Sequence, residues 1–362
     1  MNTKKQAPTI LMMAAGTGGH VFPALAVADE LTAMGARVLW LGTPTGMENA
    51  LVAKHHYPFF AIDMQGLRGK GLMRAIKLPM MLFKAVMSTK KIIKDNQVDL
   101  VMGFGGYVTA PGGLAAKLCK KPLIIHEQNA IAGMSNRNLA PYADKVLQAF
   151  DGAFGDKAMT VGNPVRGNIG ALPAPSERYD TDESKPLKVL VVGGSLGAQA
   201  LNNAVVGLLQ LSERPLSVRH QCGKDNHNDM LVAYSQANID THRHTFVLSP
   251  FIEDMSEAYA WADVVVCRAG ALTVTEISNA GVAAIFVPLP HAVDDHQTAN
   301  ANSLTEHGAG LLLPQNQLTA ESLTQTLAAL TKADCLAMAT KARQFAKDNV
   351  ATKVAQLALD LC

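Results

Sequence analysis

Short apolar runs alternate with longer amphipathic segments along almost the whole chain, and this alternation limits the possible folds more than any other feature. The longer segments, such as residues 22–34 and 198–211, carry apolar residues at helical spacing. Strands that alternate with helices in this way predict parallel sheets with helices on both faces. The runs that we interpret as strands are residues 9–15, 38–41, 98–102, 123–126, 187–192, 264–267 and 284–287.

The two halves of the chain also repeat one another. Each half opens with a strand that runs into glycines, Leu11-Met-Met-Ala-Ala-Gly-Thr-Gly-Gly-His20 and then Val189-Leu-Val-Val-Gly-Gly-Ser-Leu-Gly-Ala198. Each half later holds a second such unit, Val98-Asp-Leu-Val-Met-Gly-Phe-Gly-Gly106 and then Ala262-Asp-Val-Val-Val-Cys-Arg-Ala-Gly270. We therefore predict an α/β fold of two Rossmann-like domains that face each other across a cleft.

A segment without periodic apolar residues separates the halves. Residues 170–186 contain three prolines and several charges, which favours a connection between domains. We expect an N-terminal domain of residues 1–166 and a C-terminal domain of residues 167–344. A last helix, at about residues 345–362, is expected to pack back on the N-terminal domain.

Composition excludes several other classes of protein. The chain is 48% hydrophobic and 17% charged, which indicates ordered domains, and its net charge of +2 gives no reason to expect a nucleic-acid partner. Five scattered cysteines without a C-x-x-C pair indicate neither a disulfide framework nor a zinc site, and they favour a reducing cytoplasm. The first apolar run is too short for a signal peptide, and no run reaches the roughly 18–20 residues of a membrane span.

Glycine turns between a strand and a helix favour a phosphate-bearing ligand. They let backbone N–H groups approach phosphate oxygens, while the helix N-terminus adds positive potential. A dinucleotide is disfavoured, because Gly16-Thr-Gly-Gly-His-Val21 lacks the third glycine and the second strand reaches Thr43 without a carboxylate. We therefore predict a nucleotide site that is not a dehydrogenase site.

The segment Gly193-Gly-Ser-Leu-Gly197 keeps a hydrolase open as an alternative. It matches the G-x-S-x-G nucleophile turn, and either Asp263 or Asp294 with His296 would complete a triad in the usual chain order. However, Ser195 occupies the position of the phosphate turn in the first half, and a hydrolase needs no duplicated domain. A nucleotide-binding hydrolase that uses Ser195 is the less favoured reading.

The segment Arg268-Ala-Gly-Ala-Leu-Thr-Val-Thr-Glu-Ile277 follows a strand that we expect to be buried. Small residues expose backbone amides there, Thr273 and Thr275 offer hydroxyls, and Glu276 lies further along the helix. Amides and hydroxyls suit a diphosphate, and a carboxylate suits two ribose hydroxyls. The plainer alternative makes Glu276 an acid that compensates the helix dipole.

Taken in order, these motifs resemble the MurG family, the N-acetylglucosaminyltransferases that act on lipid I in bacterial peptidoglycan synthesis. Two positions depart from the family pattern: Ala15 replaces a common glycine, and Leu196 replaces the usual glutamine of the third glycine loop. The resemblance covers essentially the whole chain. The motifs that carry it are Gly16-Thr-Gly-Gly-His-Val-Phe-Pro23, Gly103-Phe-Gly-Gly-Tyr-Val108, His126-Glu-Gln-Asn129, Gly162-Asn-Pro-Val-Arg166, Gly193-Gly-Ser195, Ala271-Leu-Thr-Val-Thr-Glu276 and Gln297.

The resemblance implies a GT-B architecture and inverting transfer of N-acetylglucosamine from UDP-N-acetylglucosamine to lipid I, which makes lipid II. It implies donor binding mainly in the C-terminal domain, an N-terminal domain that faces acceptor and membrane, and no cofactor. The corresponding location is the cytoplasmic face of the inner membrane, as a peripheral protein. The residues expected to touch the donor are Thr17, Gly18, Gly19, Asn129, Arg166, Ser195, Ile252, Ala271, Leu272, Thr273, Val274, Thr275, Glu276 and Gln297.

Inverting transfer needs a base for the acceptor hydroxyl and stabilisation of the departing UDP. His20, beside the first glycine turn, is the leading candidate because imidazole titrates near neutrality, and Glu127 is the rival. Glycine-loop helices with Arg166 would offset the diphosphate charge without a metal. Asp180-Thr-Asp182 resembles a metal motif, but it lies in the connecting segment and is expected to be a solvated acidic patch.

Residues 64–94 contain no acidic residue and predict a membrane-facing surface. Pro79 is expected to start a helix in which Leu82, Val86 and Ile93 face the core. Apolar residues surrounded by lysines suit anionic head groups, although a solvated helix is the plainer alternative. The eight basic residues are Arg68, Lys70, Arg74, Lys77, Lys84, Lys90, Lys91 and Lys94. The residues expected to contact lipid are Met80, Phe83, Met87, Lys84 and Lys91.

Overall fold

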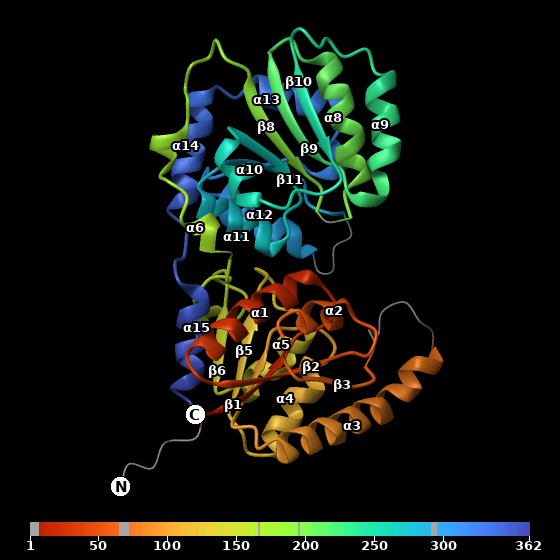
Figure 1. The fold of residues 1–362 in the computed structure, drawn as a ribbon, viewed down its shortest axis with the longest axis vertical. Helices are drawn as coiled ribbons and strands as arrows, with labels where there is room; N and C mark the ends of the chain where they lie inside the picture. Colours follow the sequence, from red (N-terminus) through yellow and green to blue (C-terminus); the bar gives the residue numbers. More distant parts are fainter. Residues whose placement is uncertain (1–6, 65–71, 166, 195, 291–294) are drawn as a thin grey trace. The chain divides into compact units, whose positions relative to one another are not determined.

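The computed structural model of the chain describes residues 7–64, 72–165, 167–194, 196–290 and 295–362, without the side chains of residues 72–77. It divides into two compact units, residues 1–165 with 349–362, and residues 166–348. Each unit is built on its own parallel sheet, with helices on both faces (Figure 1). The prediction of two Rossmann-like α/β domains is therefore confirmed for the architecture of each unit.

The first unit contains seven parallel strands in the order β3-β2-β1-β4-β5-β6-β7. Its strands are β1 Thr9–Met13, β2 Arg37–Gly42, β3 Phe59–Ala61, β4 Leu100–Gly103, β5 Leu123–Glu127, β6 Lys145–Gln148 and β7 Met159–Thr160. Its helices are α1 Gly18–Ala33, α2 Met47–Ala53, α3 Leu72–Asp95, α4 Thr109–Leu118, α5 Met134–Leu139 and α15 Val350–Leu359.

Side chains on β1 alternate between two cores because both faces of the sheet are covered. Ile10 and Met12 pack with residues of α1 and α15, whereas Leu11 and Met13 pack with residues of α3, α4 and α5. All five residues of β1 are buried. The final helix, α15, lies against α1 and belongs to the first unit, where Thr352 donates a hydrogen bond to Glu30.

The second unit repeats this pattern with six parallel strands in the order β10-β9-β8-β11-β12-β13. Its strands are β8 Leu187–Val192, β9 Leu216–Gln221, β10 Thr245–Ser249, β11 Val264–Cys267, β12 Ala283–Phe286 and β13 Leu311–Leu312. Its helices are α6 Gly167–Gly170, α7 Pro175–Arg178, α8 Gln199–Leu211, α9 His227–Gln236, α10 Met255–Trp261, α11 Ala271–Ala280, α12 His296–Thr305, α13 Ala320–Ala328 and α14 Lys332–Arg343.

Two details differ from the sequence prediction. The helix expected to start at Pro79 begins at Leu72, so Pro79 lies inside α3. The segment 170–186, which is expected to connect the domains, packs on the second unit. The Arg178 guanidinium donates to the carbonyl of Tyr259, and the Tyr179 hydroxyl donates to the carbonyl of Asp263. Anchors of this kind are single polar side chains, which leave no periodic apolar signal in the sequence.

Candidate functional site

The first glycine turn connects β1 to α1 in the first unit. Thr17 is the extended residue before the helix, and Gly18 and Gly19 form the first helical turn with His20. The His20 Nδ1 lies 3.3 Å from the Ala15 carbonyl and 3.5 Å from the Thr17 hydroxyl oxygen, so the ring is held against its own turn. Backbone N–H groups at the start of this 16-residue helix can face an anion.

The second glycine turn lies next to the first because β1 and β4 are neighbouring strands. Gly105 has a φ of +105°, and a Cβ there would come within 2.9 Å of His20 Nε2. A side chain at this position would therefore both strain the backbone and collide with the imidazole. The Thr109 hydroxyl donates to the Gly105 carbonyl at 2.8 Å, which fixes the turn to the start of α4.

Glu127 ends β5, the strand beside β4, and its buried carboxylate is saturated with hydrogen bonds. Its Oε1 accepts from the backbone N–H and the side-chain amide of Asn129, at 3.0 and 3.2 Å. Its Oε2 accepts from the Gly133 N–H at 3.0 Å and from the Asn136 side-chain amide at 2.9 Å. The carboxylate thus organises the loop that carries Asn129.

His126, one residue earlier, is a structural neutral imidazole. It is fully buried, its ring stacks on Phe104, and its Nε2 lies 2.9 Å from the Gly162 carbonyl. Burial lowers the pKa of His126 to about 4, while the Gly162 carbonyl and Glu127 act in the opposite direction. The hydrogen bond requires Nε2 to carry the proton, so Nδ1 accepts from Gln128 at 3.1 Å.

Glu48 is a buried carboxylate at this edge of the sheet that the sequence analysis missed. Its Oε1 accepts from the N–H and the hydroxyl of Thr43 at 2.9 and 2.6 Å, and its Oε2 accepts from the Gly16 N–H at 3.3 Å. It therefore ties the first glycine turn to the end of β2. An open pocket of about 430 Å³ lies beside it. The pocket is lined by Gly16, Thr43, Pro44, Thr45, Gly46, Asp63, Met64 and Tyr107.

In the second unit, the glycine turn after β8 is held by Gln221, a residue that the sequence analysis also missed. Gln221 ends β9 and is 3% exposed. Its side-chain amide donates to the Gly194 carbonyl at 3.0 Å, and its Oε1 accepts from the Ile252 N–H at 3.0 Å. One side chain thus couples the glycine turn to the loop that carries Ile252. Ser195 lies outside the described residues, as does Arg166.

The segment after β11 forms the helix α11, which begins at Ala271 behind the extended residue Gly270. Thr273 and Glu276 are partly exposed, whereas Val274 is buried. The Thr275 hydroxyl donates to the Ala271 carbonyl at 2.9 Å, so of the two predicted hydroxyls this one is engaged by the helix itself. The start of α11 is therefore a row of backbone N–H groups with a carboxylate on the next turn.

Two further side chains shape the loop after β12. The Leu289 N–H donates to Gln297 Oε1 at 2.9 Å, so Gln297 supports that loop from the first turn of α12. Arg268 donates to the carbonyls of Val287 and Pro288 at 3.1 and 3.2 Å. Burial lowers the pKa of Arg268 from its ordinary value. Because the strands are parallel, the loops after β8, β9, β11 and β12 lie at the same edge of the sheet.

The contacts of Asp263 do not favour the version of the hydrolase triad that uses this residue. Asp263 precedes β11 and accepts a hydrogen bond from the Lys188 N–H at the start of β8, at 2.9 Å. The glycine turn follows the opposite end of β8, so the six residues of the strand, at about 3.3 Å each, lie between that turn and Asp263. Asp263 instead pairs with the buried Lys332, at 3.8 Å. Asp294 lies outside the described residues.

The acidic motif Asp180-Thr-Asp182 lies on the surface. Lys185 Nζ is 2.6 Å from Asp180 and 3.8 Å from Asp182. The hydrogen bond from Lys185 lowers the pKa of Asp180. The pKa of Asp182 is lowered mainly by hydrogen bonds from Ser184, with a smaller contribution from Lys185. Within the described parts of the chain, no group of three His, Cys, Asp or Glu side chains is arranged to hold a metal ion. Helices built from the described residues are all too short or too polar to cross a membrane.

Comparison with known proteins identifies the family. The model of the glycosyltransferase family 28 N-terminal domain matches residues 10–148, and that of the C-terminal domain matches residues 188–356. A Psychrobacter arcticus protein is 60% identical over 97% of this chain and 98% of its own length. It is named UDP-N-acetylglucosamine--N-acetylmuramyl-(pentapeptide) pyrophosphoryl-undecaprenol N-acetylglucosamine transferase. The chain belongs to the MurG family.

Solved structures agree with this membership. The crystal structure of Acinetobacter baumannii MurG is similar with a TM-score of 0.87 and 46% identity, over 98% of this chain and 99% of that one. The calicheamicin glycosyltransferase CalG4 shares the fold, with a TM-score of 0.70 at 16% identity over 98% of both chains. The predicted recognition as a MurG-family glycosyltransferase and the predicted two-domain fold are both confirmed, and a hydrolase is not favoured.

Proposed function

We infer that this chain transfers N-acetylglucosamine from UDP-N-acetylglucosamine to the muramoyl sugar of lipid I and thereby makes lipid II. The observation that carries the inference is the 60% identity to a transferase of that name over 97% of the chain. Lipid II is a precursor of peptidoglycan, so the activity serves cell-wall biogenesis, cell shape and cell division. The protein is accordingly a hexosyltransferase that needs no cofactor.

The second unit is the proposed donor-binding unit. The start of α11 offers backbone N–H groups to the diphosphate, and the Glu276 carboxylate accepts hydrogen bonds from the ribose hydroxyls. Gln221 supports this assignment, because it holds the glycine turn and the Ile252 loop together. The other donor contacts proposed in this unit are Ser195, Ala271, Leu272, Thr273, Val274, Thr275 and Gln297.

The departing UDP requires stabilisation of negative charge. Helices α8 and α11 both start at the strand-end edge of the sheet, and each N-terminus carries roughly half a positive charge. Arg166 is proposed to add a full positive charge. With these groups the chemistry is proposed to be independent of a metal ion. In the first unit, Thr17, Gly18, Gly19 and Asn129 are the proposed donor contacts.

His20 is the proposed general base, ahead of Glu127. The imidazole lies at the mouth of two glycine turns, where an acceptor hydroxyl can approach it. Glu127 instead receives four hydrogen bonds from its own loop, two on each carboxylate oxygen. We assign Glu127 to the ordering of the loop that carries Asn129.

The first unit is the proposed acceptor-binding and membrane-facing unit. On α3, Val86 and Ile93 are buried and Leu82 is partly buried against the same core, whereas Met80 and Phe83 are each 65% exposed. Met87 is also exposed. This division of exposed and buried residues supports the proposed membrane face.

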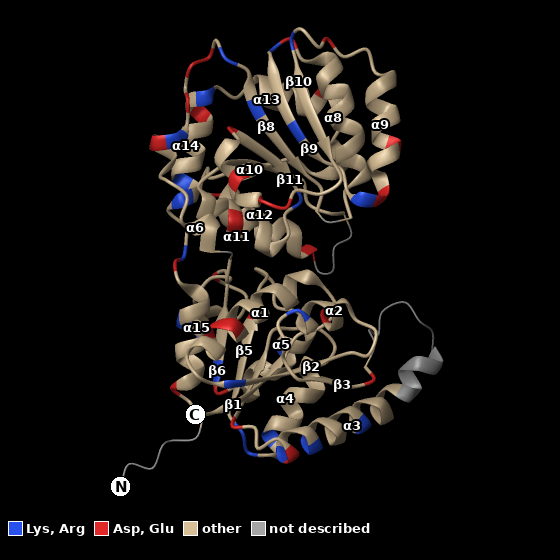
Figure 2. Cartoon of the chain, viewed as in Figure 1, with Lys and Arg blue, Asp and Glu red and all other residues tan. Residues whose placement is uncertain are grey.

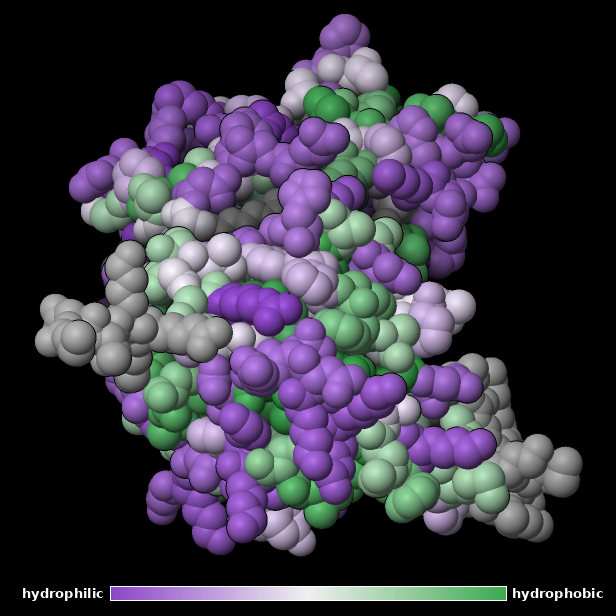
Figure 3. Space-filling model, turned by 60° about the horizontal axis from the view of Figure 1, so that its bottom comes forward, coloured by the Kyte–Doolittle hydropathy of each residue, from purple (hydrophilic) through white to green (hydrophobic). Residues whose placement is uncertain are grey.

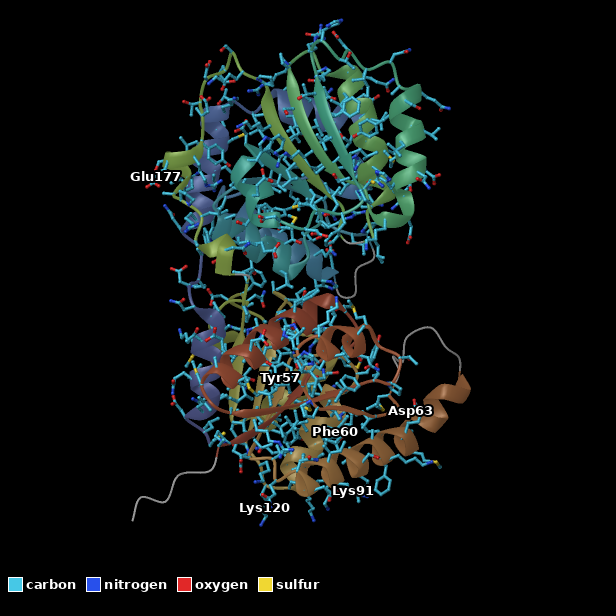
Figure 4. All side chains as sticks on the ribbon, in the orientation of Figure 1. Tyr57, Phe60, Asp63, Lys91, Lys120 and Glu177 are labelled. Atoms are coloured by element: carbon cyan, nitrogen blue, oxygen red, sulfur yellow. The ribbon has the colours of Figure 1, made fainter. Side chains whose placement is uncertain are left out.

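Basic residues surround that exposed apolar stripe. Lys84, Lys90, Lys91 and Lys94 lie on α3, and Figure 2 shows basic residues along this helix. Lys91 lies at the same edge of the unit as Lys120 (Figure 4). Figure 3 shows apolar and hydrophilic side chains interleaved on this face. Such a surface suits an anionic phospholipid layer, with each Lys or Arg adding about 1 kcal/mol. We propose peripheral attachment at the cytoplasmic face of the inner membrane.

A transfer assay tests the proposed function. Purified protein, UDP-N-acetylglucosamine and a lipid I analogue should give the disaccharide lipid only when all three are present, as measured by mass spectrometry. A hydrolase would release free N-acetylglucosamine without acceptor and would lose all activity on Ser195→Ala. That result, without any lipid product, would refute the proposed transfer.

A further inference from the structure

The hydroxyl of Tyr259 is buried against the carboxylate to which we assign the ribose. Tyr259 lies on α10 and is 1% exposed, and its hydroxyl donates to Glu276 Oε2 at 2.9 Å. We propose that Tyr259 is a positioning residue for donor binding, which presents the Glu276 carboxylate to the two ribose hydroxyls. The inference rests on the proposed donor site and adds to it a residue that acts through Glu276 and does not contact the ligand itself.

The geometry explains why a fixed carboxylate is useful here. A glutamate side chain has three rotatable bonds, and ordering it during ligand binding costs conformational entropy. A phenol held in the core has little freedom of its own, so its hydrogen bond selects one carboxylate orientation before the ligand arrives. The carboxylate has roughly four acceptor positions in total, which is enough for the tyrosine hydroxyl and for the two hydroxyl donors of a ribose.

The position of Tyr259 is itself fixed relative to α11 by one arginine. The Arg178 Nη1 donates to the Tyr259 carbonyl at 3.3 Å, and its Nη2 donates to the carbonyls of Ala280 and Gly281 at the end of α11. One planar guanidinium thus joins the end of α10 to the end of α11. The distance between the tyrosine and the glutamate is therefore set by a contact distant from the ligand.

A second arginine fixes the same end of α11. Arg343 donates to the carbonyl of Asn279 and, at 3.0 Å, to that of Gly170. The helix closes at Gly281, which has a φ of +60°, and a Cβ there would lie 3.1 Å from the Arg343 Cβ. Positive charge at the C-terminus of a helix stabilises it. Both arginines therefore hold α11 at the end opposite to the one that meets the diphosphate.

Removing both ribose hydroxyls from the ligand distinguishes a positioning role of Tyr259 from an effect on the stability of the whole unit. Calorimetric affinities for UDP and for 2′,3′-dideoxy-UDP would be measured with wild type, Tyr259→Phe and Glu276→Ala. Tyr259→Phe should weaken UDP binding about tenfold, the equivalent of about 1.4 kcal/mol, and change dideoxy-UDP binding by less than about twofold. In the transfer assay it should raise the donor KM by a similar factor while kcat and the acceptor KM stay unchanged.

Tyr179→Phe is the matched control. It removes another hydroxyl of the second unit, one that donates to the Asp263 carbonyl and accepts from the Ala283 N–H, both at 3.0 Å, at the starts of β11 and β12. Both affinities should equal those of wild type. If Tyr259→Phe does not fold, Arg178→Lys provides a second variant, which should weaken UDP more than dideoxy-UDP because the α10–α11 contact is loosened.

Two results would overturn the inference while leaving the donor site in place. In the first, Glu276→Ala weakens UDP but Tyr259→Phe binds it like wild type. In the second, Tyr259→Phe weakens UDP and dideoxy-UDP equally, which means that the tyrosine acts on the fold as a whole. If Glu276→Ala itself leaves UDP affinity unchanged, the proposed ribose contact fails and the inference fails with it.

Discussion

Replacement of Glu127 by glutamine distinguishes the two roles open to this residue. A general base would be lost with little effect on the fold, because glutamine has nearly the same shape. If the carboxylate instead organises its loop, replacing it by glutamine would leave some of the N–H donors of that loop without acceptors. The structure gives four such donors, two on each oxygen. In either orientation of the glutamine side chain, its NH₂ group faces two of these four donors and cannot accept their hydrogen bonds.

The magnitude follows from those contacts. A hydrogen bond to a charged group contributes about 1.5–3 kcal/mol, so two lost bonds at the lower value cost about 3 kcal/mol. For a unit of this size 1 kcal/mol shifts the midpoint of thermal unfolding by about 2–4 °C, so the expected decrease is about 6–12 °C. The transition of the first unit would be followed by calorimetry. Asp95→Asn, which changes an exposed carboxylate of the same unit, should leave it in place.

Kinetics on the same variant complete the test. If Glu127 orders the loop of Asn129, the donor and acceptor KM values should rise along with the loss of stability. Removal of a general base would instead lower kcat by roughly 10²–10⁴-fold at an unchanged KM. An unchanged unfolding midpoint together with such a fall in kcat would refute our assignment, and Glu127 would replace His20 as the base.

Four further outcomes are expected. His20→Ala should lower kcat much more than it raises the donor KM, and an effect on donor affinity alone would make His20 a loop-ordering residue. Burial lowers the pKa of His126 from 6.5 to about 4, so a proton binds the unfolded chain more tightly than the folded one. The free energy of unfolding should therefore have its full value above pH 6.5 and be about 2 kcal/mol lower at pH 5. Denaturant titrations of wild type and of the variant His126→Asn would show this difference, and equal pH dependence in both would contradict it. The combined change Phe83→Ser, Lys84→Glu and Lys91→Glu should reduce salt-sensitive binding to anionic vesicles and slow transfer to a long-chain acceptor while sparing a short-chain analogue. Unchanged vesicle binding would place membrane contact elsewhere. Activity should persist in EDTA, and a complete loss restored only by a divalent ion would show that the diphosphate is neutralised by metal.

The architecture could be predicted from sequence because it depends on local patterns. Runs such as residues 187–192 and 264–267 are strands over the same residues in the structure, since a strand covered on both faces must be mostly apolar. The division of α3 into buried Val86 and exposed Phe83 was equally predictable, because it follows from 100° of rotation per residue. Pro79 misled us because proline ordinarily starts or breaks a helix, whereas here it lies inside α3.

The candidate site was predictable only where it coincides with a glycine turn. The sequence identified the turns and the acid Glu276, but it contained no signal for Gln221, Glu48 or Tyr259. Each of these acts on a residue 17 to 32 positions away in sequence, so its role depends on which strands and helices are neighbours. A Gln at a strand end looks the same whether or not it spans two loops.

The sequence by itself determined the alternation of strands and helices, the paired halves and the family, because apolar periodicity and glycine spacing are properties of the chain residue by residue. Only the tertiary structure decided which groups each polar side chain contacts. Glu127 is the clearest case: its residue type allowed a base, and the four donors that surround it favour a structural carboxylate. A carboxylate's function depends on the groups that share its desolvated site, and strand order brings those groups together.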